Sequence, residues 1–237
     1  MTLQEVLRAP AAARIADVVE RMRALDAVLP EGDGIRCFNR LYLAVTEAVE
    51  ERARPGEFAD PRWVRWLDVV FANLYFDALR RFAGGRGRVP RAWAALFEAR
   101  ARPGVAPIQF ALAGMNAHIN RDLPVAVVAT CRDRRVAPRR GSPQHRDFGV
   151  VDAILAETEA RVRAQFAVGL VGVADEALGR LDSVVAMWNA RRARQAAWIG
   201  AETLWALEPL PFAAARYLSA LDRSTGFAGR GLLTPVL

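Results

Sequence analysis

Apolar residues recur at intervals of three and four positions along most of the chain, a spacing that gathers them on one face of an α-helix. The clearest stripes lie within residues 15–29, 35–54 and 61–83. Each stripe is followed by proline or glycine, residues that commonly end helices. The pattern therefore predicts three long helices over these ranges.

Shorter or weaker versions of the same pattern predict the remaining helices. Thr2 and Glu5 have the spacing of a capping box, and Asp60 followed by Pro61 is a typical helix start. The further helices are expected at residues 2–9, 90–100, 108–122, 123–130, 142–166, 181–207 and 210–221.

No stretch of useful length alternates between apolar and polar residues, as a half-buried strand would. The sequence predicts an all-α fold, a single compact multi-helix domain of about eight to ten helices over residues 1–237, without a significant β-sheet. Two irregular segments are expected in it. One is an arginine-rich loop at 131–146, and the other is a C-terminal tail at 222–237 that contains three glycines and one proline.

The most unusual stretch runs from Gly114 to Pro124 and carries polar residues within an apolar helix. His118 and Asp122 are one turn apart on one face, and Asn116 and Asn120 form a second such pair on the opposite face. A buried polar group left without a hydrogen bond costs about 1–3 kcal/mol, so a chain that only had to pack would use leucine here. Pro124 is expected to end or kink this helix just after Asp122. Asp122 would then cap the next helix.

His118 and Asp122 are the leading candidates for catalysis. An aspartate that accepts from one imidazole nitrogen raises the basicity of the other, which a general base requires. Asn116 or Asn120 would bind a carbonyl oxygen of the substrate. The plain alternative is that His118 is a core or capping histidine.

A second candidate site combines His145 with Asp147. His118, Asp122 and His145, with a carboxylate such as Asp147 or Asp77, could also form a mixed nitrogen and oxygen shell for zinc, iron or manganese. Neither an H-E-x-x-H motif nor a repeated E-x-x-H motif is present. The leading interpretation therefore has no cofactor and no metal, and a metal-dependent hydrolase is the alternative.

The helix predicted at 181–207 carries large and polar residues in a rhythm of three and four that defines one face. These residues are Trp188, Arg191, Gln195, Trp198, Glu202 and Trp205. The stripe is interpreted as a pocket wall in which Arg191 anchors a substrate anion, with Tyr42 and Tyr75 as further walls. An internal hydrogen-bonded network is the alternative.

Composition narrows the possible partners. The chain contains no lysine, so all 33 basic residues are arginine, which excludes lysine Schiff-base chemistry and a P-loop. The net charge of +7 is modest, and no nucleic-acid-binding motif accompanies the arginine-rich loop, so nucleic acid is not an expected partner. No apolar run approaches the roughly 20 residues of a membrane span, and no signal peptide is evident. We expect a cytoplasmic protein with free thiols at Cys37 and Cys131, and the sequence leaves its oligomeric state open.

Four segments together resemble an uncharacterised, largely actinobacterial family of domains of unknown function. They are Gly114 to Leu123, Phe38 to Thr46, His145 to Phe148, and Ala193 to Trp198. The resemblance covers nearly the whole chain and implies a single cytoplasmic-type domain. It carries no established activity, so it assigns no role to any residue.

The leading hypothesis is an enzyme that acts on a small, mostly apolar metabolite in a helical pocket by acid–base catalysis. Cyclisation, isomerisation, elimination and hydrolysis all suit such a site. A third hypothesis, beside the metal-dependent hydrolase, is a noncatalytic binding or scaffold protein.

Overall fold

The computed structural model describes residues 1–52, 56–168 and 189–236, and the side chains of these residues except 52 and 156–168. The described residues contain helices and no strand, which confirms the predicted all-α class. Within them there are nine helices if the central one is counted as continuous. Their bounds are α1 Leu3–Arg8, α2 Ile15–Val28, α3 Gly34–Arg52, α4 Pro61–Gly84, α5 Arg91–Ala99, α6 Pro107–Ala117, the π-helical turn η1 His118–Asp122, α7 Leu123–Asp133, α8 Pro143–Val168, α10 Ala190–Ala206 and α11 Pro211–Leu232.

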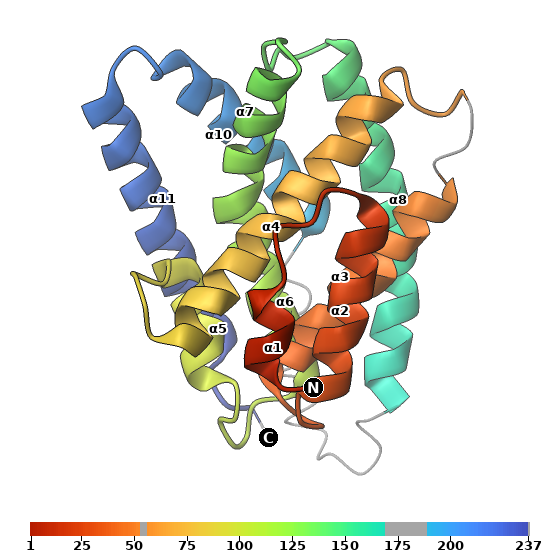
Figure 1. The fold of residues 1–237 in the computed structure, drawn as a ribbon, viewed down its shortest axis with the longest axis vertical. Coiled ribbons are helices and arrows are strands. Elements are labelled where there is room, and N and C mark those ends of the chain that lie inside the picture. The colour runs from red at the N-terminus through yellow and green to blue at the C-terminus, as the bar shows by residue number, and fades with distance from the viewer. Residues whose placement is uncertain (53–55, 169–188, 237) are drawn as a thin grey trace.

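The central helix, formed by α6, η1 and α7, runs through the middle of the bundle (Figure 1). Helix α3 packs on α6, α4 and α10 pack on α7, and α11 packs on α5 and α6. The apolar stripes predicted from the sequence face this centre, and Phe38, Trp63, Tyr75 and Trp93 are completely buried. None of the helices in the described ranges is long and apolar enough to cross a membrane.

The predicted helix starts near the N-terminus are present. Thr2 and Glu5 form the capping box of α1, with the Glu5 amide 3.3 Å from the Thr2 hydroxyl. The Asp60 carboxylate accepts from the Trp63 amide at the start of α4, and Pro61 occupies the first turn. These contacts depend on neighbouring residues alone, which is why the sequence predicts them.

Of the two effects expected of Pro124, an end or a kink of the central helix just after Asp122, the end does not occur. Residues 118–122 form a π-helical turn, in which the Leu123 amide donates to the His118 carbonyl five residues earlier, and the helix continues to Asp133. Pro124 has no N–H to donate, and its ring would crowd the carbonyl four residues before it in a regular α-helix. The wider turn accommodates the proline, and such turns often occur at functional sites.

The arginine-rich loop is shorter than predicted. Residues 131–133 belong to α7, and residues 143–146 are the first turn of α8, so the loop comprises residues 134–142. Cys131 is completely buried on α7, and burial raises the pKa of its thiol to about 11. Arginines occur both in the loop and in the adjoining turns of α7 and α8, so the arginine content does not mark where these helices end and begin.

The predicted irregular tail at 222–237 is also wrong, because α11 continues to Leu232. Its glycines let the helix approach α5 closely: a Cβ atom at Gly226 would lie 2.7 Å from the Arg91 carbonyl oxygen. The Asp222 carboxylate also accepts from the amides of Arg91 and Ala92, at 3.0 and 3.1 Å, at the start of α5. This packing offsets the helix propensity that each glycine loses, about 1 kcal/mol. Another helix is predicted at 181–207. Its first residues, 181–188, lie outside the described residues, and α10 begins at Ala190.

The close approach of α11 to α5 predicts opposite effects of two alanine substitutions. Gly226→Ala should destabilise the protein by about 1–3 kcal/mol, because the new methyl group meets backbone that has little room to move. Gly231→Ala on the same helix is the matched control. It meets no atom within 4 Å, and should leave stability unchanged or raise it by up to about 1 kcal/mol. Urea unfolding measures both, and equal effects would contradict the close packing of these helices.

Candidate active site

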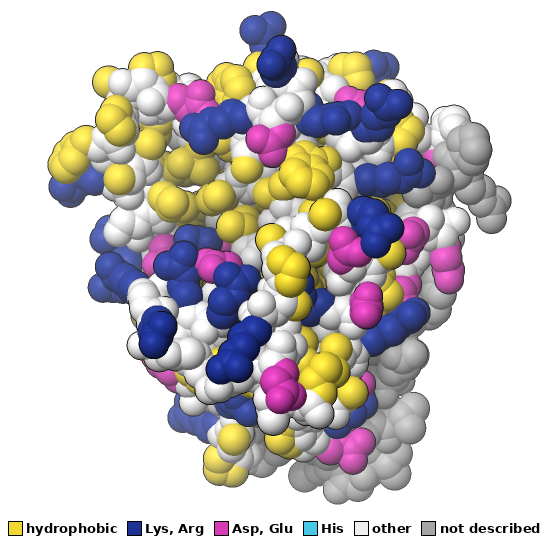
Figure 2. All heavy atoms as spheres, in the orientation of Figure 1, with side chains coloured by type: hydrophobic (Ala, Val, Ile, Leu, Met, Phe, Trp, Pro, Cys, Tyr) yellow, Lys and Arg dark blue, Asp and Glu magenta, His cyan; other side chains and the backbone are white. Residues whose placement is uncertain are grey.

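His118 is buried in a cage of aromatic rings. Its imidazole stacks on Phe71 with 3.4 Å between ring centroids and 4° between planes, and it meets the edge of Tyr42 at 4.5 Å. Phe38 and Trp93 complete the cage at 5.8 and 5.7 Å. The side chain is 1% exposed. No histidine is visible on the face of the molecule in Figure 2, where arginines and acidic residues are interspersed with apolar side chains.

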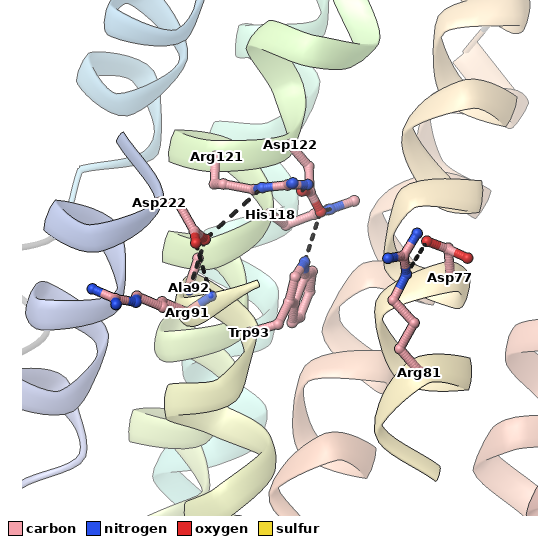
Figure 3. Close-up of polar contacts among 9 residues, drawn as sticks. All are labelled: Asp77, Arg81, Arg91, Ala92, Trp93, His118, Arg121, Asp122 and Asp222. Atoms are coloured by element: carbon pink, nitrogen blue, oxygen red, sulfur yellow. Dashed lines mark hydrogen bonds and ion pairs between the residues drawn. The ribbon is translucent and has the colours of Figure 1, made fainter. Parts of the chain in front are cut away.

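The Asp122 carboxylate, also fully buried, is held by three donors (Figure 3). It accepts from the Trp93 indole at 2.7 Å and from the Arg121 guanidinium at 2.5 Å, and His118 Nδ1 lies 3.4 Å away. The predicted contact between His118 and Asp122 is therefore present. The prediction that Asp122 caps α7 is wrong, because its side chain makes no cap hydrogen bond and its oxygens are used by these three partners.

This arrangement leaves one imidazole nitrogen free. A carboxylate paired with arginine can only accept, so the proton on a neutral His118 belongs on Nδ1. Nε2 then carries the lone pair, and it is buried without a hydrogen-bond partner. Burial lowers the pKa of His118, although the hydrogen bond and charge of Asp122 oppose that effect. The geometry thus presents a neutral imidazole with an available basic nitrogen.

A cavity of about 50 Å³ adjoins His118. Its walls are mostly aliphatic and aromatic side chains from α3, α4, α8 and the central helix. The polar side chains on its lining are Tyr42, Asp68, His118 and Arg194, with the indole of Trp63. The Nε1 atom of Trp63 makes no hydrogen bond to oxygen or nitrogen and lies near the Cys131 thiol. Known ligand sites have the same composition, apolar with a few polar groups, but enclose about 300–1,000 Å³.

Asp68 on α4 has an uncommon environment. Its Oδ2 atom is inaccessible to solvent and has no hydrogen-bond partner. Burial and the charge of Glu50 raise the pKa of this carboxyl to about 7, while the positive charge of Arg194 opposes the rise. A carboxyl with a pKa near neutrality is suited to exchanging protons at physiological pH.

Arg194 on α10 is 5% exposed and reaches the same cavity. Its guanidinium pairs with Asp152, donates to the Phe148 carbonyl at 3.1 Å, and lies 4.0 Å from the centre of the Phe148 ring. These contacts hold a positive charge beside Asp68 in an apolar wall.

The face of the last long helix that packs inward is not the face predicted as the pocket wall. Arg191 and Gln195 are exposed, and Trp188 lies outside the described residues. The buried residues of α10 are Ala190, Arg194, Ala197, Trp198, Gly200 and Ala201. The small residues let α10 approach α7 closely, which turns Arg194 inward and Arg191 outward.

Of the aromatic residues predicted to form the pocket walls, one lines the cavity and others pack elsewhere. Tyr42 lines the cavity, whereas Tyr75 is buried against Phe38 and Trp93 outside its lining. Trp198 is buried and donates to Glu202 at 3.1 Å, as the alternative of an internal network predicted. Trp205 packs half-buried at the edge of the core.

Asn116 and Asn120 do not line the cavity. Asn116 donates to the Thr225 carbonyl of α11 at 2.9 Å, and Asn120 donates to the Asn116 amide oxygen at 3.0 Å. The opposite face predicted for this pair is correct. The predicted binding of a substrate carbonyl by either residue is not supported, because both side chains serve the contact with α11.

In the second candidate site, the polar atoms of Asp147 and His145 form hydrogen bonds with the main chain. Asp147 accepts from the amides of Ala59 and Asp60 before α4, and His145 Nδ1 accepts from the Gly141 amide. Asp77 pairs with arginines on its own helix, among them Arg81 (Figure 3). Among the residues that the structure describes, no group of three or more histidine, cysteine or acidic side chains is placed to hold a metal. The metal shell proposed from His118, Asp122, His145 and Asp147 is therefore not assembled there.

Sequence reasoning missed Asp68 and Arg194. Asp68 lies one turn after Val64 and one turn before Phe71, so it borders the buried stripe of its helix, and the residue as a whole is half-buried. Arg194 belongs to the Ala193 to Trp198 segment that carried part of the family resemblance. Both signals were present, but a single charged residue on a long helix usually faces solvent.

Comparison with known proteins identifies a family for this chain. The model of a family of unknown function, DUF5995, matches residues 15–235. No curated protein and no solved structure matches the chain.

The raised pKa of Asp68 predicts a pH-dependent cost in stability. A folded-state pKa of about 7, above the ordinary value of 3.8, means that the protonated carboxyl stabilises the fold at low pH. This stability is complete below pH 4 and is lost as the pH rises to 7. Asp68→Asn should therefore match the wild type near pH 4 and exceed its unfolding free energy by a few kcal/mol at pH 8. Asp77→Asn, on the exposed side of the same helix, is the control, and identical pH profiles for wild type and Asp68→Asn would contradict the burial of this carboxyl.

The geometry of His118 predicts its protonation state. Nitrogen NMR should show a neutral imidazole with the proton on Nδ1 at pH 7, because burial disfavours the cation and Asp122 accepts from Nδ1. Asp122→Asn should lower the pKa of His118 further, since it removes a negative charge. His145 is the only other histidine and provides the reference signal. An imidazolium at pH 7, or a proton on Nε2, would overturn this assignment.

Proposed function

This chain belongs to DUF5995, a family of unknown function, and we propose that it is an enzyme that transfers protons on a small, mostly apolar molecule. One observation carries the proposal. His118 Nε2 and Asp68 Oδ2 are both buried without partners, and both side chains line the same apolar cavity.

The energetic argument concerns what a purely structural site would do. Each buried polar atom without a hydrogen bond costs about 1–3 kcal/mol, and apolar replacements of similar size would avoid that cost. The Nδ1 side of His118 has its carboxylate partner, so the imidazole is already positioned by the fold. The free Nε2 and the Asp68 carboxyl are then available for a ligand.

The two groups have complementary roles. His118 is neutral and oriented by Asp122, so Nε2 acts as the general base. With a pKa of about 7, Asp68 is present in both protonation states at neutral pH and acts as the proton donor. Arg194 moderates the charge of Asp68, and Asp122 acts only through His118.

The cavity lining favours isomerisation or elimination among the reactions open to acid–base catalysis. The residues described on the lining include no serine, threonine or cysteine that could act as a nucleophile. Apolar walls also exclude the water that hydrolysis requires. Isomerisation and elimination need only a base, an acid and a dry site.

The cavity volume bears on substrate size. A cavity of about 150 Å³ admits benzene in a well-studied engineered protein. The cavity beside His118, at about 50 Å³, holds only a fragment of a few atoms in the conformation described. Any larger substrate has to widen the site as it binds.

A matched pair of histidine variants tests the proposal. The assay follows a panel of small apolar ketones, alkenes and hydroxy compounds by proton NMR in D₂O. His118→Gln should lower any turnover at least 100-fold, the usual scale for losing a general base, and keep the helical circular dichroism spectrum. His145→Gln, which changes the histidine outside the cavity, should retain activity. Equal activity in the two variants would exclude His118 as the base.

A further inference from the structure

We propose that the cavity binds a carbonyl oxygen of the substrate between the Tyr42 hydroxyl and the Asp68 carboxyl, and stabilises the enolate that His118 generates. The inference rests on the proposed function and specifies its substrate class, an apolar carbonyl compound with a hydrogen on the neighbouring carbon. It is carried by the set of unpartnered polar atoms around the cavity.

Tyr42 supplies the first donor. Its hydroxyl is buried without a partner, and the side chain lines the cavity with its ring 4.5 Å from the imidazole of His118. Burial, with the charges of Asp68 and Asp122, keeps the pKa of Tyr42 well above its ordinary value. The phenol therefore holds its proton, and Asp68 lies within electrostatic reach of it.

Asp68 supplies the second donor when it is protonated. The carboxyl has two oxygens, and Oδ2 is inaccessible and unpartnered on the same lining. The charged groups that act on it are Glu50 from α3 and Arg194 from α10, and Arg194 is itself paired with Asp152 from α8. Two O–H donors beside an apolar cavity fit an oxygen atom that has two lone pairs.

The base is separate from these donors. His118 Nε2 is an acceptor, since its other nitrogen faces Asp122. A ligand that complements the site therefore presents an acceptor oxygen to Tyr42 and Asp68 and a hydrogen to His118. An ammonium group would suit ionised Asp68 instead, but the positive charge of Arg194 on the same lining disfavours a second cation and favours a developing oxyanion.

The reaction step follows from these roles. The lone pair of His118 Nε2 takes a proton from the carbon beside the carbonyl, and the electron pair of that C–H bond forms a carbon–carbon double bond. The π electrons of the carbonyl move to its oxygen, which becomes an enolate oxygen held by the two donors. The imidazolium then returns its proton to the same carbon or to a conjugated one. No oxidant, reductant or further reactant is needed.

Three ring compounds of similar size, phenol, toluene and benzylamine, test the assignment. Phenol mimics an enolate oxygen, toluene has no polar group, and benzylamine carries an ammonium group. At pH 6 phenol should bind at least tenfold more tightly than the other two, as measured by NMR titration. Tyr42→Phe should remove that advantage. Asp68→Leu should reduce it, and Asp68→Asn, which retains a donor, should restore most of it.

The outcomes separate this inference from the function on which it rests. Failure of all three compounds to bind would overturn the proposed function as well, because the site would then not widen to admit even a ring-sized substrate. Binding of toluene as tight as that of phenol, or preference for benzylamine, would overturn only the carbonyl assignment. Deuterium exchange beside the carbonyl of cyclopentanone gives a second readout. It should be accelerated by the wild type and by His145→Gln, and lost in His118→Gln and in the Tyr42→Phe, Asp68→Leu double variant.

Discussion

The buried charge of Asp122 is the constraint on which the centre of this protein depends. A carboxylate removed from water must be compensated by donors, and here they come from Arg121, Trp93 and His118. Two of them lie on the same π-helical turn as Asp122, and Trp93 comes from α5. Asp222 on α11 extends the arrangement, because it lies 4.0 Å from Arg121 and caps α5. The orientation of the imidazole is thus a consequence of neutralising one charge.

The polar groups on the two sides of the central helix differ in a way that indicates function. Towards α11, Asn116 and Asn120 are hydrogen-bonded to each other and to main chain. Towards the cavity, His118 Nε2, Tyr42 Oη and Asp68 Oδ2 have no partner. Other buried polar atoms without partners, such as Tyr75 Oη and Thr130 Oγ1, lie away from the cavity, so the indication comes from the grouping of three such atoms around one apolar space. This grouping is the basis of the proposed site.

The parts of the site that could be predicted are contacts between residues close together in the sequence. The contact between His118 and Asp122 follows from their spacing of four residues, so it was predicted. Arg194 and Arg191 are three residues apart on neighbouring faces of α10, and only packing against α7 determines which face is buried. Asp68 was missed for the same reason, because a lone charged residue beside an apolar stripe usually faces solvent and only packing determines that it lies on the cavity.

The helical class, most helix starts and the local pairs along the central helix follow from the amino-acid sequence alone, because periodicity and capping act within a few residues. Packing between distant segments determines which polar groups are left without partners around the cavity. It also determines that Gly226 belongs to a helix and that Pro124 is accommodated by a π-helical turn. Local preferences of about 1 kcal/mol per residue are readily outweighed by packing between segments more than 100 residues apart, such as α5 and α11.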